Sequence, residues 1–514
     1  MNTNEQMIHD AMSAAKDVEL RNVIADIMLA PRVADFIKRR QVADIVRQSF
    51  ERAGFFCRTA DNRLFYFDKR ERRLYDLDAR DFEYALSALT TLGKSESVYN
   101  FTLHSLKTAA ARTAAVEVHT LAHFDSASGF LAVSDGRAGV WTRERAGDWT
   151  LRANGDDGLL FLTELDAQPF EPAFDSKNQL AWFLDRFLLA ARDSLSIDDQ
   201  KSLLLVNLLH SFFPALRRTR LIPAALGAMG SGKSTAARLL GRLLVGSNFE
   251  VALLRKEHED AFVATICNRT VCGFDNADSR IPWLEDALAT YATGQRYRLR
   301  RLYTTNDEVT FDPRAIIIIT SRDPHFTRPD VAERLLPLYF ERPTAYVAEP
   351  IIFDQLAQRR NEIWGELLTY LAVVADFVTE NEAPPLAFRM ADFAAFGWSV
   401  FALRNKQHEW IQLLARLERA QAGFAAQNDG IIEVLKTMLS EDGEIPPVAT
   451  GELFARCRAR AEAEGLAFPA TAQGFGRRLT SMKRVIELEL KCRFTETTAR
   501  EGKRYITITS LSNE

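Results

Sequence analysis

Residues 227–235, GAMGSGKST, constrain the fold of this chain more than any other stretch. They fit the pattern G-x-x-x-x-G-K-[ST], in which glycines let backbone N–H groups curve around phosphates. An apolar run at 221–226 suits a buried strand, and leucines at helical spacing follow through residue 245. The sequence therefore predicts a strand, a loop and a helix that bind a nucleoside triphosphate. The predicted cofactor-binding residues are Gly227, Gly230, Ser231, Gly232, Lys233, Ser234 and Thr235.

Within this loop, Lys233 is expected to reach the β- and γ-phosphates, and Ser234 is expected to ligate Mg²⁺. Such a site also needs an acidic residue at the end of an apolar strand, and Asp275 follows the run 270–274. The next residue is Asn276, which cannot accept a proton. We therefore expect Asp278, or Glu285 on the following helix, to orient the attacking water. The alternative role for Asp278 is a helix N-cap.

The composition limits the other possibilities. The chain has 514 residues, 47% apolar residues and a formal net charge of −4, so a nucleic-acid surface would have to be local. Its five scattered cysteines form no C-x-x-C pair, which indicates packing residues in a reducing compartment. The polar start and the absence of a long apolar run predict a soluble, cytoplasmic protein without membrane contact.

We predict a multidomain α/β chain with four parts. Residues 1–175 read as an α+β accessory domain, with a β-hairpin at 64–77. Residues 176–350 read as preceding helices and a P-loop core with a parallel sheet, 351–427 as a helical lid, and 428–514 as a winged helix. The expected strands of the core, besides 221–226, are 249–254, 270–274, 315–320 and 336–340.

A basic hairpin precedes the strand that ends at Thr320 and Ser321. Its first strand follows Arg296, its tip is 304–307, and its second strand ends at Phe311. Thr320 is expected to place a hydroxyl beside the γ-phosphate. Three arginines follow, and one of them could stabilise transition-state charge in a neighbouring subunit. The first candidate is Arg334 and the second is Arg328; the alternative for Arg334 is a local ion pair with Asp330 or Glu333.

In this order, the phosphate loop, the Asp275 strand, the hairpin and Thr320-Ser321 resemble the AAA+ ATPases over about residues 220–345. The hairpin looks like that of the superfamily 3 and MCM-like helicases of phages, plasmids and other mobile elements. The resemblance implies a homo-hexameric ring with ATP sites between subunits and hairpins that grip single-stranded or forked DNA. It also implies ATP and Mg²⁺ as cofactors, and a second sensor arginine at Arg389, whose alternative is an ion pair with Asp392.

The candidate DNA contacts of the hairpin are Arg298, Arg300 and Thr305; the arginines could equally meet acidic groups on the next subunit. The chain departs from the family at Asn276, where a second acidic residue is usual, and at the hairpin tip, which lacks lysine or histidine. We therefore hold two functions open. One is an ATP-driven DNA helicase or translocase of a mobile genetic element. The other is an ATP-gated DNA-binding initiator, loader or defence assembly factor without processive unwinding.

The C-terminal part carries a second basic cluster. Residues 471–484 read as a recognition helix, flanked by strands at 485–490 and 505–509 and a basic wing. A winged helix that contacts protein is the alternative, because acidic residues dilute the positive field. The candidate DNA contacts here are Arg477, Arg478, Lys483, Arg484 and Lys503. His119 and His123 lie four residues apart without an accompanying motif and read as surface or packing histidines.

Overall fold

The computed structural model describes residues 18–511 apart from short gaps. The gaps are 165, 193, 278–280, 301–307, 312, 314, 323–325, 327, 427–428 and 499–503, and the side chains of 298–300 and 308–311 are not described either. Contacts divide the chain into two compact units. The first comprises residues 1–123 and 130–169, and the second comprises 124–129 and 170–514. The boundaries of the four domains expected from the sequence remain predictions.

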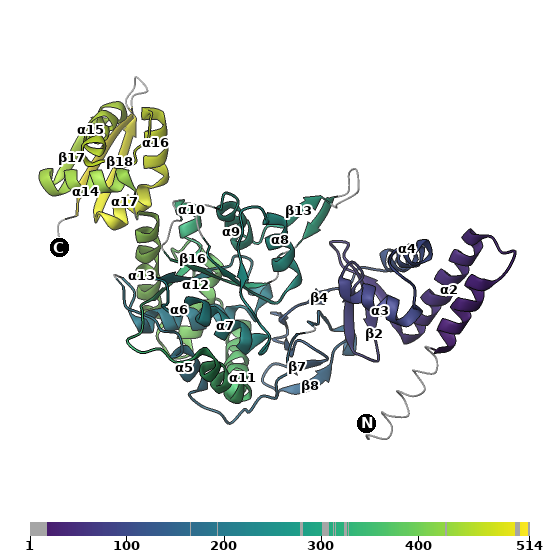
Figure 1. The fold of residues 1–514 in the computed structure, drawn as a ribbon. Coiled ribbons are helices and arrows are strands. Elements are labelled where there is room, and N and C mark those ends of the chain that lie inside the picture. The colour runs from purple at the N-terminus through teal and green to yellow at the C-terminus, as the bar shows by residue number, and fades with distance from the viewer. Residues whose placement is uncertain are drawn as a thin grey trace. The chain divides into compact units, whose positions relative to one another are not determined.

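The first unit begins with helices packed on a small antiparallel sheet (Figure 1). The expected hairpin is confirmed, because β2 and β3 pair in register from Phe65 with Asp76 to Asp68 with Arg73. Buried aromatic rings such as Phe50, Tyr66 and Phe82 fill the core between helices and sheet. The elements are α2 (Asp35–Ala53), β1 (Gly54–Arg58), β2 (Leu64–Asp68), β3 (Arg73–Asp76), α3 (Arg80–Thr90) and α4 (Ser97–Ala111).

Short strands complete the first unit. A two-stranded parallel pair, β4 with β9, lies beside a four-stranded sheet of order β5-β6-β7-β8. The strands are β4 (Val118–His119), β5 (Ala122–Phe124), β6 (Leu131–Ser134), β7 (Gly139–Arg143), β8 (Thr150–Ala153) and β9 (Leu160–Phe161). The α+β character expected for this region is therefore present.

The second unit is built on a five-stranded parallel sheet of order β11-β12-β15-β10-β16. Three of its strands, β10, β15 and β16, are almost completely buried, as expected for a sheet covered on both faces. The strand expected at 249–254 is shorter, because only 252–253 pair with β12. The strands are β10 (Ile222–Gly227), β11 (Ala252–Leu253), β12 (Val271–Asp275), β15 (Ile316–Ser321) and β16 (Leu335–Phe340).

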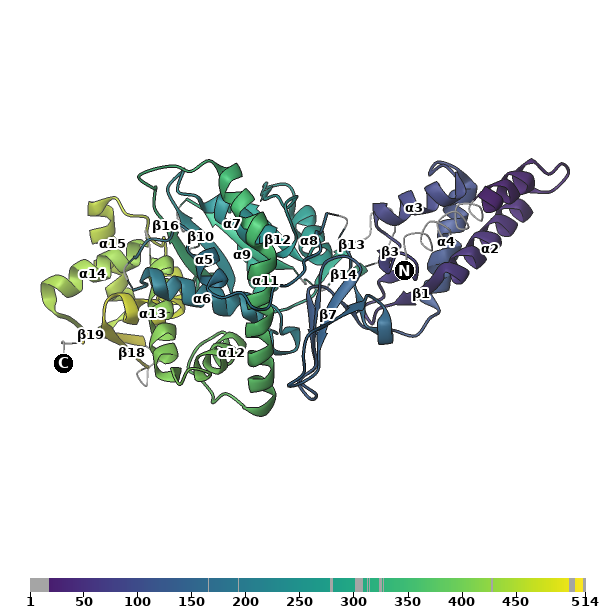
Figure 2. The same cartoon turned by 90° about the horizontal axis from the view of Figure 1, so that it is seen from below.

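Helices flank this sheet and continue into an all-helical segment. The helices of the sheet region are α5 (Gln179–Leu184), α6 (Ile197–His210), α7 (Lys233–Leu244), α8 (Glu259–Asn268), α9 (Leu284–Ala292) and α10 (Pro329–Ala332). The all-helical segment contains α11 (Glu349–Glu380), α12 (Ala391–Ala402) and α13 (Gln407–Ala426). Figure 2 shows α11 as one long helix, and Arg360 and Trp364 fasten it to the end of α7 by donating to the carbonyl of Leu243.

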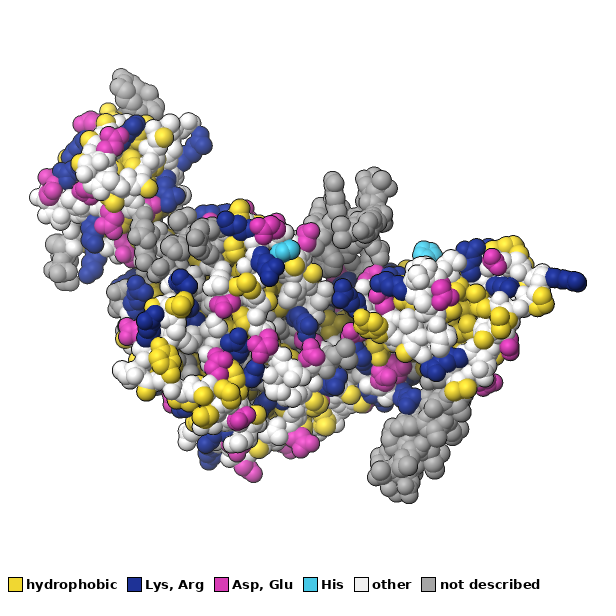
Figure 3. Space-filling model, viewed as in Figure 1, with side chains coloured by type: hydrophobic (Ala, Val, Ile, Leu, Met, Phe, Trp, Pro, Cys, Tyr) yellow, Lys and Arg dark blue, Asp and Glu magenta, His cyan; other side chains and the backbone are white. Residues whose placement is uncertain are grey.

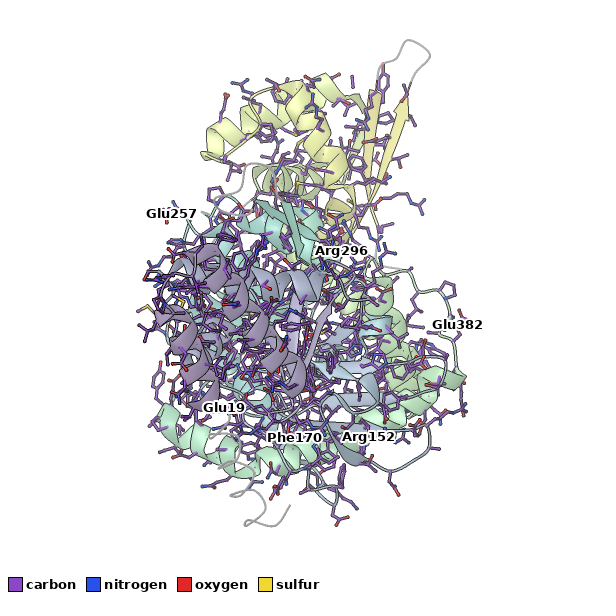
Figure 4. The ribbon with its side chains drawn as sticks, turned by 90° about the vertical axis from the view of Figure 1, so that its right-hand side faces the viewer. Glu19, Arg152, Phe170, Glu257, Arg296 and Glu382 are labelled. Carbon is purple, nitrogen blue, oxygen red and sulfur yellow. The ribbon has the colours of Figure 1, made fainter. Side chains whose placement is uncertain are left out.

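An irregular connection interrupts the all-helical segment. Helix α11 ends at Glu380, and the connection through Pro384 and Pro385 has no regular structure before α12. Figure 4 labels Glu382 on this connection. Proline removes a backbone donor and disfavours helix in the residue before it, which explains the break.

The C-terminal part contains four helices and a three-stranded antiparallel sheet of order β17-β19-β18. The expected strand at 485–490 is wrong, because these residues belong mainly to a helix. Leu479, Met482 and Ile486 are all buried at a spacing of three and four residues, so helical packing overrides the apolar and acidic alternation. The elements are α14 (Gly430–Asp442), β17 (Glu444–Ala449), α15 (Thr450–Glu464), α16 (Ala472–Ser481), α17 (Lys483–Glu489), β18 (Cys492–Thr498) and β19 (Arg504–Ser510).

The charged surface residues and the cysteines are arranged as the composition leads us to expect. On the face drawn in Figure 3, basic and acidic side chains are interspersed. All five cysteines are buried and unbonded to one another, which confirms the packing role expected for them. Across the described ranges, no helix combines the length and apolar character needed to cross a bilayer.

Candidate nucleotide site

The phosphate loop joins β10 to α7, as the motif predicts. Gly227, Gly230 and Gly232 have φ values of 155°, 80° and 88°, which side-chain-bearing residues rarely adopt. A Cβ added at Gly227 would also lie 2.1 Å from the carbonyl oxygen of Phe340 on the neighbouring strand. Helix α7 begins directly at Lys233, so its N-terminal N–H groups point toward the loop.

Lys233 is held inside the curve of this loop. Its side-chain nitrogen donates to the carbonyl oxygens of Gly227 at 2.8 Å and Ala228 at 2.7 Å. The side chain is buried, and Ser231 Oγ lies 3.5 Å from the same nitrogen. The ammonium group is therefore positioned beside the backbone that would surround a phosphate.

Asp275 connects three elements at the carboxyl edge of the sheet. Ser234 Oγ, on α7, donates to Asp275 Oδ2 at 3.0 Å, and Thr320 Oγ1, on β15, donates to Asp275 Oδ1. The structure thus brings together the residues that the sequence assigned to the metal shell and to the γ-phosphate. Hydroxyl and carboxylate oxygens are suitable Mg²⁺ ligands, and Mg²⁺ commonly binds through one or two protein groups plus substrate phosphates.

The backbone turns sharply after Asp275. Asn276 adopts a left-handed conformation with φ of 57°, which asparagine tolerates better than most residues. The N–H of Ala277 then donates to the Thr320 carbonyl at 2.8 Å and fastens the ends of β12 and β15 together. Asp278 lies outside the described residues. Glu285 occupies the first turn of α9 and is partly buried.

Two arginines approach the loop from neighbouring strands. Arg342, two residues after β16, donates from Nε to the Met229 carbonyl at 2.7 Å. Arg322, which follows β15, places Nη2 3.2 Å from the Met229 sulfur. Sequence reasoning did not single out Arg342. Its position just after the last buried strand could have indicated it, because the carboxyl ends of parallel strands lie at the same edge of the sheet as the phosphate loop.

Exposed apolar side chains surround the same loop. Met229, Tyr346 and Leu188 are 63%, 68% and 46% exposed. A Cβ at Gly230 would lie 3.3 Å from the Tyr346 hydroxyl, and a Cβ at Gly232 would lie 3.4 Å from Leu188 Cδ1. These side chains offer apolar surface beside the phosphate loop, as nucleotide-base sites require.

Thr235 contacts a neighbouring helix rather than the loop. Its hydroxyl donates to Glu349 Oε1 at 2.5 Å, and Arg238 lies 3.5 Å from the same oxygen. Glu349 begins α11, so this contact links the start of α7 to the helical segment. The expected role of Thr235 in cofactor binding remains a prediction.

Three predicted arginines lie at the opposite edge of the sheet. Ile222 pairs with Leu335 at the start of β10 and β16, whereas Gly227 pairs with Phe340 at the phosphate-loop end. Arg334 directly precedes β16, and its carbonyl accepts from Ile222 N at 3.0 Å. Arg334 therefore cannot contact the phosphate loop of its own chain, because about six strand residues, or about 20 Å, separate the two edges.

Acidic partners hold these arginines together. Arg328 donates to both carboxylate oxygens of Asp330, at 3.0 and 2.9 Å, and also to Asp286. Arg334 lies 3.6 Å from Asp330, which agrees with the local ion pair considered from the sequence. Arg334 is only 12% exposed, compared with 41% for Arg328.

Arg389 belongs to the same cluster. It pairs with Glu333, next to Arg334, and not with Asp392. Asp392 instead accepts from the backbone N–H and the hydroxyl of Thr219. The structure does not bring Arg389 to the phosphate loop of its own chain, where a second sensor would act.

The basic hairpin is present. Strands β13 (Tyr297–Arg300) and β14 (Glu308–Phe311) pair in antiparallel register from Tyr297 with Phe311 to Arg300 with Glu308. Arg296, labelled in Figure 4, is exposed directly before β13. The side chains of Arg298 and Arg300 are not described, and Thr305 at the expected tip lies outside the described residues.

The basic residues of the C-terminal part have different surroundings. Arg478 donates to Asp429 Oδ2 at 3.0 and 2.5 Å, and Arg484 pairs with Glu418 of α13 at 2.9 Å. Arg477 is exposed, and Lys483 lies over the ring of Phe494 at 5.8 Å. Lys503 lies outside the described residues. Intramolecular ion pairs thus occupy two of the predicted contacts.

Part of the chain matches a known protein family. Residues 195–406 match a family described as actinomycete integrative conjugative element replication protein. This segment is similar to mobile-element replication proteins. It contains the phosphate loop, Asp275, Thr320 and the arginine cluster, and it agrees with the mobile-element resemblance stated from the sequence. No curated protein matches the chain in sequence.

Two solved structures show distant likeness. The A-form apo structure of the NrS-1 C-terminal region has a TM-score of 0.38 and 11% identity, over 90% of this chain and 98% of that one. A structure described as SCCmec type IV Cch, active helicase, has a TM-score of 0.39 and 10% identity, over 87% of this chain and 90% of that one.

Proposed function

We propose that this chain is an ATP-driven, ring-forming DNA helicase or translocase of a mobile genetic element. The observation that carries the proposal is the convergence of Ser234 and Thr320 on Asp275, beside the loop that encloses Lys233. A hydrolytic nucleotide site needs a phosphate cradle, a metal-shell carboxylate and a polar group near the γ-phosphate. The match of residues 195–406 to replication proteins supports the biological setting.

The proposed cofactors are ATP and Mg²⁺. Lys233 and the loop N–H groups would bind phosphates, and Ser234 and Asp275 would hold the metal ion, which supplies positive charge to the transferring phosphoryl group. Leu188 and Tyr346, which lie beside Gly232 and Gly230 of the loop, would contact the base. Arg342 would exchange the Met229 carbonyl for a phosphate oxygen, because its guanidinium already lies at the loop.

A homo-hexameric ring is proposed from the position of the arginine cluster. Arg328 and Arg334 lie at the sheet edge opposite their own phosphate loop, so they could act only on a nucleotide bound by another subunit. Arg328 is the better candidate, because it is more exposed than Arg334. This order reverses the preference derived from the sequence.

DNA is proposed as the partner of the hairpin and of the C-terminal part. The helix and strand order of α14 to β19, with sheet order β17-β19-β18, supports a winged helix. Exposed Arg477 and Lys483 are its best candidate phosphate contacts, since Arg478 and Arg484 are engaged in ion pairs.

Strand separation tests the proposal. The purified full chain should unwind a forked DNA duplex only when ATP and Mg²⁺ are present. Lys233→Ala should abolish unwinding, because the variant lacks the ammonium at the phosphates. Arg47→Ala, which removes a partly exposed side chain of α2, should unwind normally. The helicase proposal would be contradicted if the unaltered protein separated no forked duplex and if DNA did not change its rate of ATP turnover.

Asn276 favours a second candidate, an ATP-gated DNA-binding assembly factor without processive unwinding. Its side chain cannot accept a proton from the attacking water, and its backbone has a left-handed conformation with φ of 57°. Tight ATP binding with negligible turnover, combined with ATP-dependent DNA binding, would support this candidate over the motor.

A further inference from the structure

Three potential metal ligands meet in the first unit. Glu117, His119 and His123 each offer a ligand atom, and these atoms lie within 4.8 Å of one another. His119 Nδ1 and Glu117 Oε1 are 3.8 Å apart. His119 lies on β4, His123 on β5, and Glu117 directly before β4. The group is therefore gathered by the turn between two strands that belong to different sheets.

The surrounding packing fixes both imidazole rings. His119 is opposite Phe161 in the β4–β9 pair, and its ring contacts that of Phe161 with centroids 5.3 Å apart. The His119 carbonyl also accepts from Leu162 N at 2.8 Å. His123 contacts the ring of Phe130 at 6.1 Å, and the two imidazole centroids are 4.2 Å apart. Phenylalanine rings beside both histidines restrict the rotation of their side chains.

The ligand chemistry favours a borderline-soft divalent cation. Imidazole nitrogen and carboxylate oxygen are common zinc ligands, with bonds of about 2.0–2.2 Å. Tetrahedral coordination at that bond length separates ligand atoms by about 3.3 Å, so ligand atoms that lie within 4.8 Å of one another would move closer by about 1.5 Å at most when the ion binds. Two histidines and one carboxylate leave a fourth position for water.

We propose that Glu117, His119 and His123 form a Zn²⁺-class metal site that joins the β4–β9 pair to the β5–β8 sheet. The ion would cross-link the two sheets where only residues 120 and 121 separate their strands. Its role is stabilisation of the first unit. The site is independent of the proposed nucleotide chemistry, so either proposal can fail without the other.

Spectroscopic titration tests the site. The purified full chain, stripped of metal with a chelator, is titrated with Co²⁺ and then Zn²⁺ near pH 7.5 under native conditions. We expect one Co²⁺ per chain with the visible absorption of low-coordinate cobalt, displaced by Zn²⁺. His123→Ala and Glu117→Gln should each weaken Zn²⁺ binding at least tenfold, whereas His104→Ala on α4 should match the unaltered protein.

Thermal unfolding gives a second readout, because an ion bound only to the folded state raises the melting temperature. Zn²⁺ should stabilise the unaltered chain and His104→Ala, and not His123→Ala. The His119 side chain is only 9% exposed, so His123 and Glu117 decide the test if His119→Ala does not fold. The proposed metal site would be contradicted if the chain did not bind one Co²⁺ ion, or if His123→Ala bound Zn²⁺ as tightly as the unaltered chain.

Discussion

Asp275 is the residue on which the candidate nucleotide site depends. It accepts hydrogen bonds from Ser234 and Thr320, and its carboxylate is the group that we propose holds the metal ion. We expect Asp275→Asn to lower ATP turnover at least a hundredfold, or about 2.7 kcal/mol in activation free energy, because the charge is lost while the size is kept. Steady-state phosphate release measures this effect.

The control for this substitution is Asp260→Asn, which removes an exposed carboxylate in the first turn of α8. It should leave turnover within twofold of the unaltered chain. Equal turnover in Asp275→Asn and the unaltered chain would contradict the assigned role.

His210 makes the second unit sensitive to acid. It is fully buried, its Nε2 lies 2.9 Å from the Leu216 carbonyl, and its ring stacks on Phe396. Burial, and then the charge of Arg217, lower the pKa of His210 to about 3. The unfolded chain therefore binds this proton first as pH falls, and stability declines by up to about 1.4 kcal/mol per pH unit below about pH 6.5.

We expect the melting temperature, followed by circular dichroism, to fall between pH 7.5 and pH 5. His210→Gln keeps a donor for the Leu216 carbonyl and removes the titrating group, so its melting temperature should fall less over the same range. Identical pH profiles for the two proteins would show that His210 does not control acid sensitivity.

Within helix α16, two adjacent arginines are expected to have different roles, one in DNA binding and the other in the stability of the fold. Arg477 is exposed, whereas Arg478 pairs with Asp429, the N-cap of α14. Arg477→Ala should weaken DNA binding and reduce its salt dependence while leaving the melting temperature unchanged. Arg478→Ala should instead cost about 1–2 kcal/mol of stability, since the buried Asp429 carboxylate loses its ionic partner.

Fluorescence anisotropy at several salt concentrations and thermal unfolding measure the two effects. If Arg477→Ala bound DNA as tightly as the unaltered chain at every salt concentration, α16 would not be a DNA-contacting helix. The protein-contact alternative for the winged helix would then be preferred.

Local sequence patterns predicted some secondary-structure elements correctly and others wrongly. The phosphate loop, β10, the 64–77 hairpin and the basic hairpin follow from glycine positions, turn residues and short-range patterning. The segment 485–490 alternates like a strand but forms helix α17, because it packs against α13 and β18. Strand β17 was missed because its two prolines are unusual in strands.

At the scale of the whole molecule, side-chain partners were less predictable than elements. The sequence indicated Lys233 and Ser234 through the phosphate-loop motif, and Asp275 and Thr320 because each lies at the end of a recognisable strand. It could not indicate that Arg389 pairs with Glu333 or that Arg342 reaches Met229, since these pairs are separated by 56 and 113 residues. Their contacts depend on tertiary packing.

A ring with shared sites predicts complementation between inactive variants. Lys233→Ala and Arg328→Ala should each hydrolyse ATP poorly. Mixed before assembly, they should recover activity, because about one quarter of head-to-tail interfaces would combine an intact phosphate loop with an intact arginine. Turnover of the mixture that equals the mean of the separate variants would contradict donation of Arg328 between subunits.

In the proposed motor, DNA controls ATP hydrolysis at the site formed by Lys233, Ser234, Asp275 and Thr320. The most direct measurement is ATP turnover by the purified full chain with and without single-stranded DNA. We expect Mg²⁺-dependent turnover that DNA stimulates and that Asp275→Asn lowers at least a hundredfold under both conditions. Turnover that is absent, or that persists unchanged in Asp275→Asn, would contradict it.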